Sequence, residues 1–150
     1  MSDTENKASG TNWGVVTFLD ILGWKGIYTR HSSPLPTLKR FIGGIEKELE
    51  KTRGLTTGKT EVKSISDTIA VLTTCPPDQV SLAIEAHGLI CCWAIPSSIE
   101  REIPVRGATS AGKFENQENA FIGQAIDEAA SWYENSDWIG VHLTPSAQFQ

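Results

Sequence analysis

The stretch FLDILGWKG, residues 18–26, places one acidic side chain inside an apolar run. Val, Phe, Leu and Ile residues on both sides of Asp20 predict a strand over residues 13–22 that is buried or nearly so. A carboxylate in such a strand loses hydration and needs a compensating partner. The candidate partners are a basic side chain such as Lys25 or Arg106, a hydrogen-bonded turn, or a bound cation.

The composition is that of one globular domain. The chain of 150 residues is long enough for its own core, and its net charge of −5 argues against a surface that coats nucleic acid. Three cysteines without a CxxC pair indicate reduced thiols in the cytoplasm. No signal peptide and no apolar run of membrane-spanning length is recognisable. We therefore expect a cytoplasmic protein with no nucleic-acid or membrane partner, with a flexible arm over residues 1–12 and one domain over residues 13–150.

Periodicity along the rest of the chain predicts alternating strands and helices. The order β-α-β-β-α-β-β-α-β is that of an α+β domain. The expected elements after the first strand are a helix from Thr37 to near Gly54, a hairpin over 60–74 that turns near Ser66 and Asp67, a helix capped by Asp78 with His87 as a core or rim residue, a linker over 95–104, strands over 105–114, 120–123 and 138–144, and a helix over 126–133.

The first part of this order packs most economically as a ferredoxin-like sheet. In that sheet the second strand of the hairpin lies between the first hairpin strand and the strand over residues 13–22, antiparallel to both. The end of the 13–22 strand and the hairpin turn then meet at one edge of the sheet. Asp20 and Asp67 are therefore expected one strand apart, close enough to share a ligand.

Paired carboxylates at a sheet edge suit Mg²⁺ or Mn²⁺, which prefer oxygen ligands and retain water for substrate phosphates. Each aspartate also has a structural interpretation: Asp67 as a turn former, and Asp20 as the partner of a basic side chain. The pair together favours the metal hypothesis. Gly23 and Gly26 follow Asp20 and either form an ordinary turn or direct backbone N–H groups at an anion.

Arg106 lies in a strand that otherwise reads as buried, so it needs an anion. Two alternatives are open at this point. It forms a structural ion pair with Asp20 or a nearby glutamate, or it contacts a phosphate.

Four segments in a fixed order carry a family resemblance: VVTFLDILGWKG (15–26), VKSISDTIAVL (62–72), IPVRGATSAGKF (103–114) and FIGQAIDEAASWYE (121–134). They resemble the catalytic domain of class III nucleotidyl cyclases. Within that group the chain is most similar to the pyrimidine (uridylate or cytidylate) cyclases of bacterial Pycsar antiphage defence. The resemblance spans roughly residues 13–147 and implies a palm-type, ferredoxin-like α+β fold with a central, mostly antiparallel sheet flanked by helices.

The resemblance also implies roles for individual residues. Asp20 and Asp67 match the catalytic, metal-binding aspartates, and Ile21 matches the residue that lends a backbone carbonyl to one metal ion. Further matches are Leu22, Gly23, Trp24 and Lys25 in the loop that holds the β- and γ-phosphates, Arg106 as an arginine that contacts the triphosphate, and Lys63 as the base-selecting lysine.

Three positions depart from the adenylyl cyclase pattern. The base-selecting aspartate is replaced by Ala120, and the asparagine and arginine of the third helix align with Asp127 and Ser131. Recognition of adenine by the usual lysine–aspartate pair is therefore not expected. The group that stabilises charge at the α-phosphate also has no assigned residue.

The implied activity is conversion of UTP or CTP to the 3′,5′-cyclic monophosphate and pyrophosphate with two divalent ions, Mn²⁺ or Mg²⁺, per site. The implied assembly is a homodimer with sites at the interface, and the product activates a separate effector protein. Two alternatives are a purine cyclase, and a catalytically silent module that binds nucleotide or only dimerises. The residues do not decide between uracil and cytosine.

Overall fold

The computed structural model describes residues 12–135 and 137–150. Residues 1–11, most of the expected N-terminal arm, lie outside the described part, and Asn12 already belongs to the first strand. The elements are β1 (Asn12–Ile21), η1 (Ile27–Thr29), α1 (Pro34–Thr52), β2 (Lys59–Ile65), β3 (Thr68–Thr74), η2 (Pro77–Gln79), α2 (Val80–Glu100), β4 (Val105–Gln117), β5 (Ala120–Ile122), α3 (Gln124–Tyr133), β6 (Gly140–Leu143) and α4 (Pro145–Gln148).

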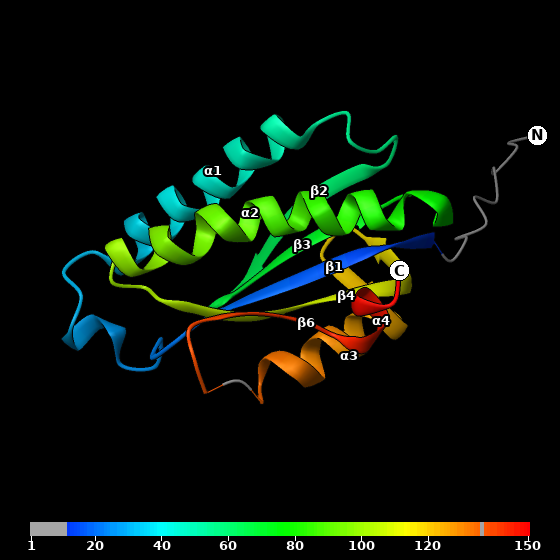
Figure 1. The fold of residues 1–150 in the computed structure, drawn as a ribbon. Coiled ribbons are helices and arrows are strands. Elements are labelled where there is room, and N and C mark those ends of the chain that lie inside the picture. Colours follow the sequence, from blue (N-terminus) through cyan, green and yellow to red (C-terminus); the bar gives the residue numbers. More distant parts are fainter. Residues whose placement is uncertain (1–11, 136) are drawn as a thin grey trace, which may run out of the picture.

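A single sheet runs through the centre of the fold. Its strand order is β2-β3-β1-β4-β5, all neighbours being antiparallel, and β6 pairs with β4 in parallel. The position of β3 between β2 and β1, antiparallel to both, confirms the predicted ferredoxin-like arrangement. Helices α1 and α2 cover one face of the sheet and α3 lies on the other (Figure 1).

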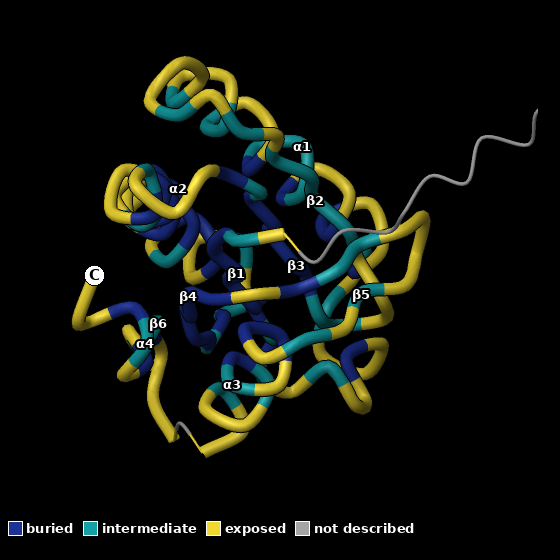
Figure 2. The backbone as a smooth tube through the Cα atoms, turned by 90° about the vertical axis from the view of Figure 1, so that its right-hand side faces the viewer, coloured by how far each residue is buried: buried dark blue, intermediate teal, exposed yellow. Residues whose placement is uncertain are grey.

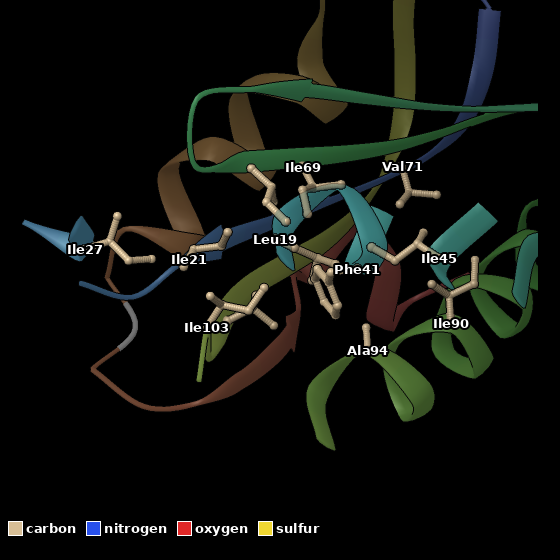
Figure 3. Packing of buried hydrophobic residues seen from close by; sticks show 12 residues of the cluster. Leu19, Ile21, Ile27, Phe41, Ile45, Ile69, Val71, Ile90, Ala94 and Ile103 are labelled. Atoms are coloured by element: carbon tan, nitrogen blue, oxygen red, sulfur yellow. The ribbon is translucent and has the colours of Figure 1, made fainter. Parts of the chain in front are cut away.

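β1 is buried on both of its faces, which explains its continuous apolar run. Leu19 and Ile21 join a cluster with Phe41 of α1 on one face (Figure 3). Phe18 joins a second cluster, which includes residues of α3, on the other face. Because side chains alternate along a strand, Asp20 lies on the same face as Phe18. Buried residues are concentrated along β1, β3 and β4 (Figure 2).

Close packing between α1 and α2 explains one of the paired glycines in α1. The rings of Phe41 and Trp93 are stacked with centroids 5.7 Å apart. A Cβ added to Gly44 would lie 2.1 Å from the Trp93 ring, whereas one added to Gly43 would meet nothing within 4 Å. Gly44 is therefore required by the approach of Trp93, and Gly43 is not.

The prediction of a linker over residues 95–104 is wrong, because α2 continues through Pro96 to Glu100. Ser98 is buried near the helix end: its hydroxyl donates to the Ile95 carbonyl (2.7 Å) and accepts from the Val105 amide (3.2 Å). Burial of this last turn compensates for the backbone hydrogen bond that proline removes.

Other boundaries also differ from the prediction. α1 begins at Pro34 rather than Thr37, β4 extends to Gln117, and the helix α4 was not expected. Asp78 lies in η2 and makes no capping hydrogen bond to α2. His87 is a core residue, as expected, at 1% exposure.

By length and composition, the segment Pro77–Glu100 is apolar enough to cross a membrane, with a mean hydropathy of 1.4. Core helices pass the same test. Here 44% of the apolar window is buried, and α2 contacts α1, β1 and β4.

Candidate active site

Asp20 lies near the end of β1, between two neighbouring strands. It is paired in register with Thr68 of β3 and with Arg106 of β4. Arg106 Nε donates to Asp20 Oδ2 at 3.1 Å, and Thr68 Oγ1 lies 3.5 Å from Asp20 Oδ1. The side chains of Asp20 and Arg106 are 13% and 22% exposed. The ion pair is one of the two alternatives that the sequence left open for Arg106.

Asp67 lies in the turn between β2 and β3, next to the end of β1. The Ile21 amide donates to the Asp67 carbonyl at 3.0 Å, which joins the two aspartate-bearing segments through the backbone. Ser66, before Asp67, has a φ of 57°, as expected in a tight turn. The predicted adjacency of Asp20 and Asp67 is confirmed. Their role as metal ligands stays a prediction.

The electrostatic surroundings of Asp20 are mixed. Burial raises the pKa of Asp20 above its ordinary value, and the charge of Asp67 adds to this shift. The hydrogen bond and charge of Arg106 act in the opposite direction. A second positive charge at this point would favour the ionised form of Asp20.

The loop over residues 22–25 connects β1 to η1. The Leu22 amide donates to the Pro104 carbonyl at 2.8 Å, and the Trp24 side chain packs against the core. Gly23 has a φ of 69°, a left-handed conformation that glycine adopts without strain. Within residues 12–135 and 137–150, the amides of Gly23 and Lys25 have no hydrogen-bond acceptor, and the Trp24 amide closes the turn at Leu22 and Gly23 without a hydrogen bond of full geometry. These amides can therefore receive an anion.

An apolar pocket of about 210 Å³ lies next to Asp20 on the α3 side of the sheet. Thr68 belongs both to this pocket and to the surroundings of Asp20. Phe18 lies 5.9 Å from Phe121 and 6.0 Å from Tyr133 between ring centroids, so aromatic side chains form much of the wall. The lining residues are Phe18, Lys63, Ile65, Thr68, Ala70, Phe121, Ala130 and Tyr133.

Lys63 lies at the polar end of this pocket. Its ammonium group donates to the Asn116 side-chain carbonyl and to the Glu118 backbone carbonyl. The Asn116 amide in turn donates to the Glu61 carboxylate. These bonds join the edge strand β2 to the end of β4, so Lys63 holds the two strand ends together.

Asp127 and Ser131 are not brought to Asp20. Both are exposed on α3 and line an open depression together with Glu128 and Ser146. The Ser131 hydroxyl donates to the Glu128 carbonyl at 2.9 Å. In one chain these residues do not contribute to the site around Asp20.

The donors around Asp20 fit a hard divalent cation. Two neighbouring carboxylates and the Ile21 backbone carbonyl would supply oxygen ligands, and Mg²⁺ or Mn²⁺ would complete its shell with water and phosphate. The described residues contain no group of three or more His, Cys, Asp or Glu side chains that would enclose a metal alone. Substrate phosphates would have to complete the site.

Sequence reasoning missed three residues here. Thr68 contacts Asp20, and Tyr133 lines the same pocket as Thr68 and lies close enough to Asp20 for its charge to affect the Tyr133 pKa. Burial raises the pKa of Tyr133, and the nearby Asp20 charge adds to the effect. The hairpin register could have identified Thr68, which follows Asp67 directly. The third residue, Arg30, bonds to the loop over residues 22–25, and no sequence signal identified it.

The sequence matches no family model and no curated protein at a significant level, but solved structures share the fold. The TM-score is 0.61 to a class III adenylyl cyclase-like ATP-binding protein from Pseudomonas aeruginosa (18% identity, 92% of this chain and 34% of that one). The TM-score is 0.65 to the catalytic core of a rhodopsin-guanylyl cyclase with converted specificity, in complex with ATPαS. The identity is 17%, and the match covers 89% of this chain and 76% of that one. The TM-score is 0.55 to a bacterial light-regulated adenylyl cyclase, with 14% identity over 93% of this chain and 45% of that one.

This chain spans only 34% of the Pseudomonas aeruginosa structure, so the likeness is to one part of that protein. At these identities the likeness concerns the fold. The chain has the fold of class III nucleotidyl cyclase catalytic domains, an α+β fold with a central, mostly antiparallel sheet.

Proposed function

We propose that the chain is a pyrimidine nucleotide cyclase of the cytoplasm that converts UTP or CTP to the 3′,5′-cyclic monophosphate and pyrophosphate. We further propose that it makes the second messenger of a bacterial antiphage (Pycsar) system with a separate effector. The observation that carries the cyclase proposal is the adjacency of Asp20 and Asp67 at the end of β1 within a class III cyclase fold.

The residues of this chain would divide the chemistry as follows. Asp20, Asp67 and the Ile21 carbonyl would hold two divalent ions, Mn²⁺ or Mg²⁺. When bound, these ions lower the pKa of the ribose 3′-hydroxyl and neutralise charge on the departing pyrophosphate. The amides of Gly23 and Trp24, neither of which makes a hydrogen bond of full geometry within the described residues, would receive the triphosphate.

The bond that forms joins the 3′-oxygen to the α-phosphorus, and the bond that breaks joins the α-phosphorus to the oxygen bridging to the β-phosphate. Pyrophosphate leaves with the electron pair of that bond, and the proton of the 3′-hydroxyl passes to solvent water. Two cationic side chains would form ion pairs with the triphosphate. They are Lys25, which is exposed, and Arg106, which lies beside Asp20.

The base and ribose would be held by a second copy of the chain. Asp127 and Ser131 are exposed on α3 and do not contribute to the Asp20 site of their own chain, which supports a role across a homodimer interface. The pocket beside Lys63, about 210 Å³ with aromatic walls, suits a flat ring. Ala120, in place of an aspartate, favours a pyrimidine over adenine.

The test is incubation of the protein with Mn²⁺ and each of ATP, GTP, CTP and UTP, followed by chromatographic separation of the products. A cyclic product from UTP or CTP alone supports the proposal. A purine product would indicate a purine cyclase. This alternative is favoured by the similar solved structures, which are described as adenylyl or guanylyl cyclases. Nucleotide binding without turnover would indicate a silent module. This alternative is favoured by Asp127 and Ser131, which stand in place of the asparagine and arginine of adenylyl cyclases.

A further inference from the structure

Arg30 turns back from the end of η1 onto the loop that follows β1. Its Nη2 donates to the Leu22 carbonyl at 3.1 Å and to the Gly23 carbonyl at 2.5 Å. The residue is exposed, and no carboxylate in the described part of the chain forms an ion pair with it. Within the described residues, the only hydrogen-bond partners of its side chain are the two loop carbonyls.

Gly23 makes this contact possible in two ways. Its φ of 69° gives the loop its turn. A Cβ at this position would also lie 2.7 Å from Arg30 Nη2, inside the contact distance of the two atoms. A side chain at position 23 would therefore push the guanidinium away from the loop.

The two bonds determine where the next two amides point. In a trans peptide the C=O and the N–H of one unit point in opposite directions. Because the carbonyls of Leu22 and Gly23 face Arg30, the N–H groups of Gly23 and Trp24 face away from it. The Gly23 N–H has no acceptor in residues 12–135 and 137–150, and the Trp24 N–H closes the turn at Leu22 and Gly23 without a hydrogen bond of full geometry. Successive amides that point to one side form a concave anion site.

We propose that Arg30 is a positioning residue for triphosphate: it holds the two peptide planes so that the Gly23 and Trp24 amides face the phosphates. Arg30 itself stays on the opposite side of the loop and does not contact the substrate. Its positive charge also polarises both peptide units, which strengthens their N–H groups as donors. This inference rests on the proposed use of the loop for phosphate binding.

Binding of inorganic tripolyphosphate with Mg²⁺, measured by calorimetry, tests the role of Arg30 without any turnover. Arg30→Ala should weaken binding about tenfold, which corresponds to about 1.4 kcal/mol. Arg30→Lys keeps the charge but not the forked donor, so it should recover only part of the affinity. Millimolar methylguanidinium should restore binding to Arg30→Ala. The matched control Arg53→Ala, which removes another exposed arginine, at the C-terminal cap of α1, should bind as the wild type does.

The free protein supplies a second readout. The amide resonances of Gly23 and Trp24 should shift in Arg30→Ala before any anion is added, while the thermal midpoint stays unchanged. With nucleotide substrate, KM should rise about tenfold with kcat changed less than twofold, because the loop holds the phosphates equally in ground and transition states.

The outcomes separate the two hypotheses. If the wild type binds no tripolyphosphate, the loop is not a phosphate site and both hypotheses fail. If the wild type binds and Arg30→Ala binds equally well, the phosphate loop stands and the role of Arg30 is overturned. Full recovery in Arg30→Lys without a shift of the Gly23 and Trp24 amides would also overturn it, because charge alone would then suffice.

Discussion

Arg106 on β4 lies directly opposite Asp20 on β1, and its Nε donates to the carboxylate over 3.1 Å. The guanidinium therefore occupies the Oδ2 side of the carboxylate, where it would compete with a cation bound to that oxygen. Two unit charges of the same sign 4 Å apart repel by about 4 kcal/mol at an effective dielectric constant of 20. A divalent ion at Oδ2 of Asp20 would therefore compete with Arg106 in its present position. A triphosphate would offer Arg106 an alternative anion.

Replacing Arg106 by glutamine should therefore change metal and nucleotide binding in opposite directions. Without nucleotide, Mn²⁺ should bind Arg106→Gln about tenfold more tightly, because no ion pair has to be broken. A non-hydrolysable nucleotide should then tighten Mn²⁺ binding less than it does in the wild type. Electron paramagnetic resonance of free Mn²⁺ measures both effects, with Arg53→Gln as the control. Equal Mn²⁺ affinity of Arg106→Gln and the wild type would show that the ion pair does not compete with metal.

Removing the Asp20 charge should abolish stabilisation by metal and nucleotide. Mn²⁺ with UTP at about 100 times the Kd should stabilise the wild type by about 2.7 kcal/mol, on the order of 5–10 °C in Tm. Asp20→Asn should lose this gain, while Asp78→Asn, at an exposed position in η2, should keep it. Differential scanning fluorimetry is sufficient. A wild-type Tm that does not respond to Mn²⁺ and any of the four nucleotides would argue against a metal site at Asp20.

His87 should make the protein sensitive to acid. Its Nδ1 lies 2.7 Å from Thr17 Oγ1 and its Nε2 lies 2.8 Å from Thr73 Oγ1, in the core under α2. Burial lowers the pKa of His87 to about 3. Between about pH 6.5 and pH 3 the unfolded chain binds a proton at this site that the folded chain does not. The contribution of neutral His87 to the free energy of unfolding is therefore complete above pH 6.5. As the pH falls below 6.5, this contribution is lost by about 1.4 kcal/mol per pH unit.

Chemical denaturation at several pH values measures this effect. His87→Gln should be less stable at pH 7, because Gln does not reproduce both hydrogen bonds, but its free energy of unfolding should fall less steeply toward pH 4. Parallel pH profiles of the variant and the wild type would refute the assignment.

The glycine pair in α1 offers a matched test of helix packing. Gly44→Ala should destabilise the fold by about 1–3 kcal/mol, because its Cβ would lie 2.1 Å from the Trp93 ring. Gly43→Ala has open space and should stabilise α1 by up to about 1 kcal/mol. Thermal unfolding of the two variants compares these effects. Equal Tm values would mean that α1 and α2 pack less closely than described.

The core of the fold and the pairing of the two aspartates were predictable from local patterns. Each pattern that identified an element depends only on neighbours in the sequence. These patterns are the alternation of apolar residues in strands, the turn at Ser66 and Asp67, and the helical spacing from Leu38 onward. The strand order then followed because few topologies connect such elements. The end of α2 was not predictable, since burial of Ser98 outweighs the local effect of Pro96.

The sequence by itself determined that Asp20 lies in a buried strand and that Asp67 lies at a neighbouring turn. Only the tertiary structure decided which partners these residues have. The β1–β4 register places Arg106 opposite Asp20, and the path of the chain after β1 places Arg30 behind the carbonyls of the loop. Such contacts join residues that are distant in sequence or separated by a turn. Their geometry depends on how whole elements pack, which no local pattern of side chains encodes.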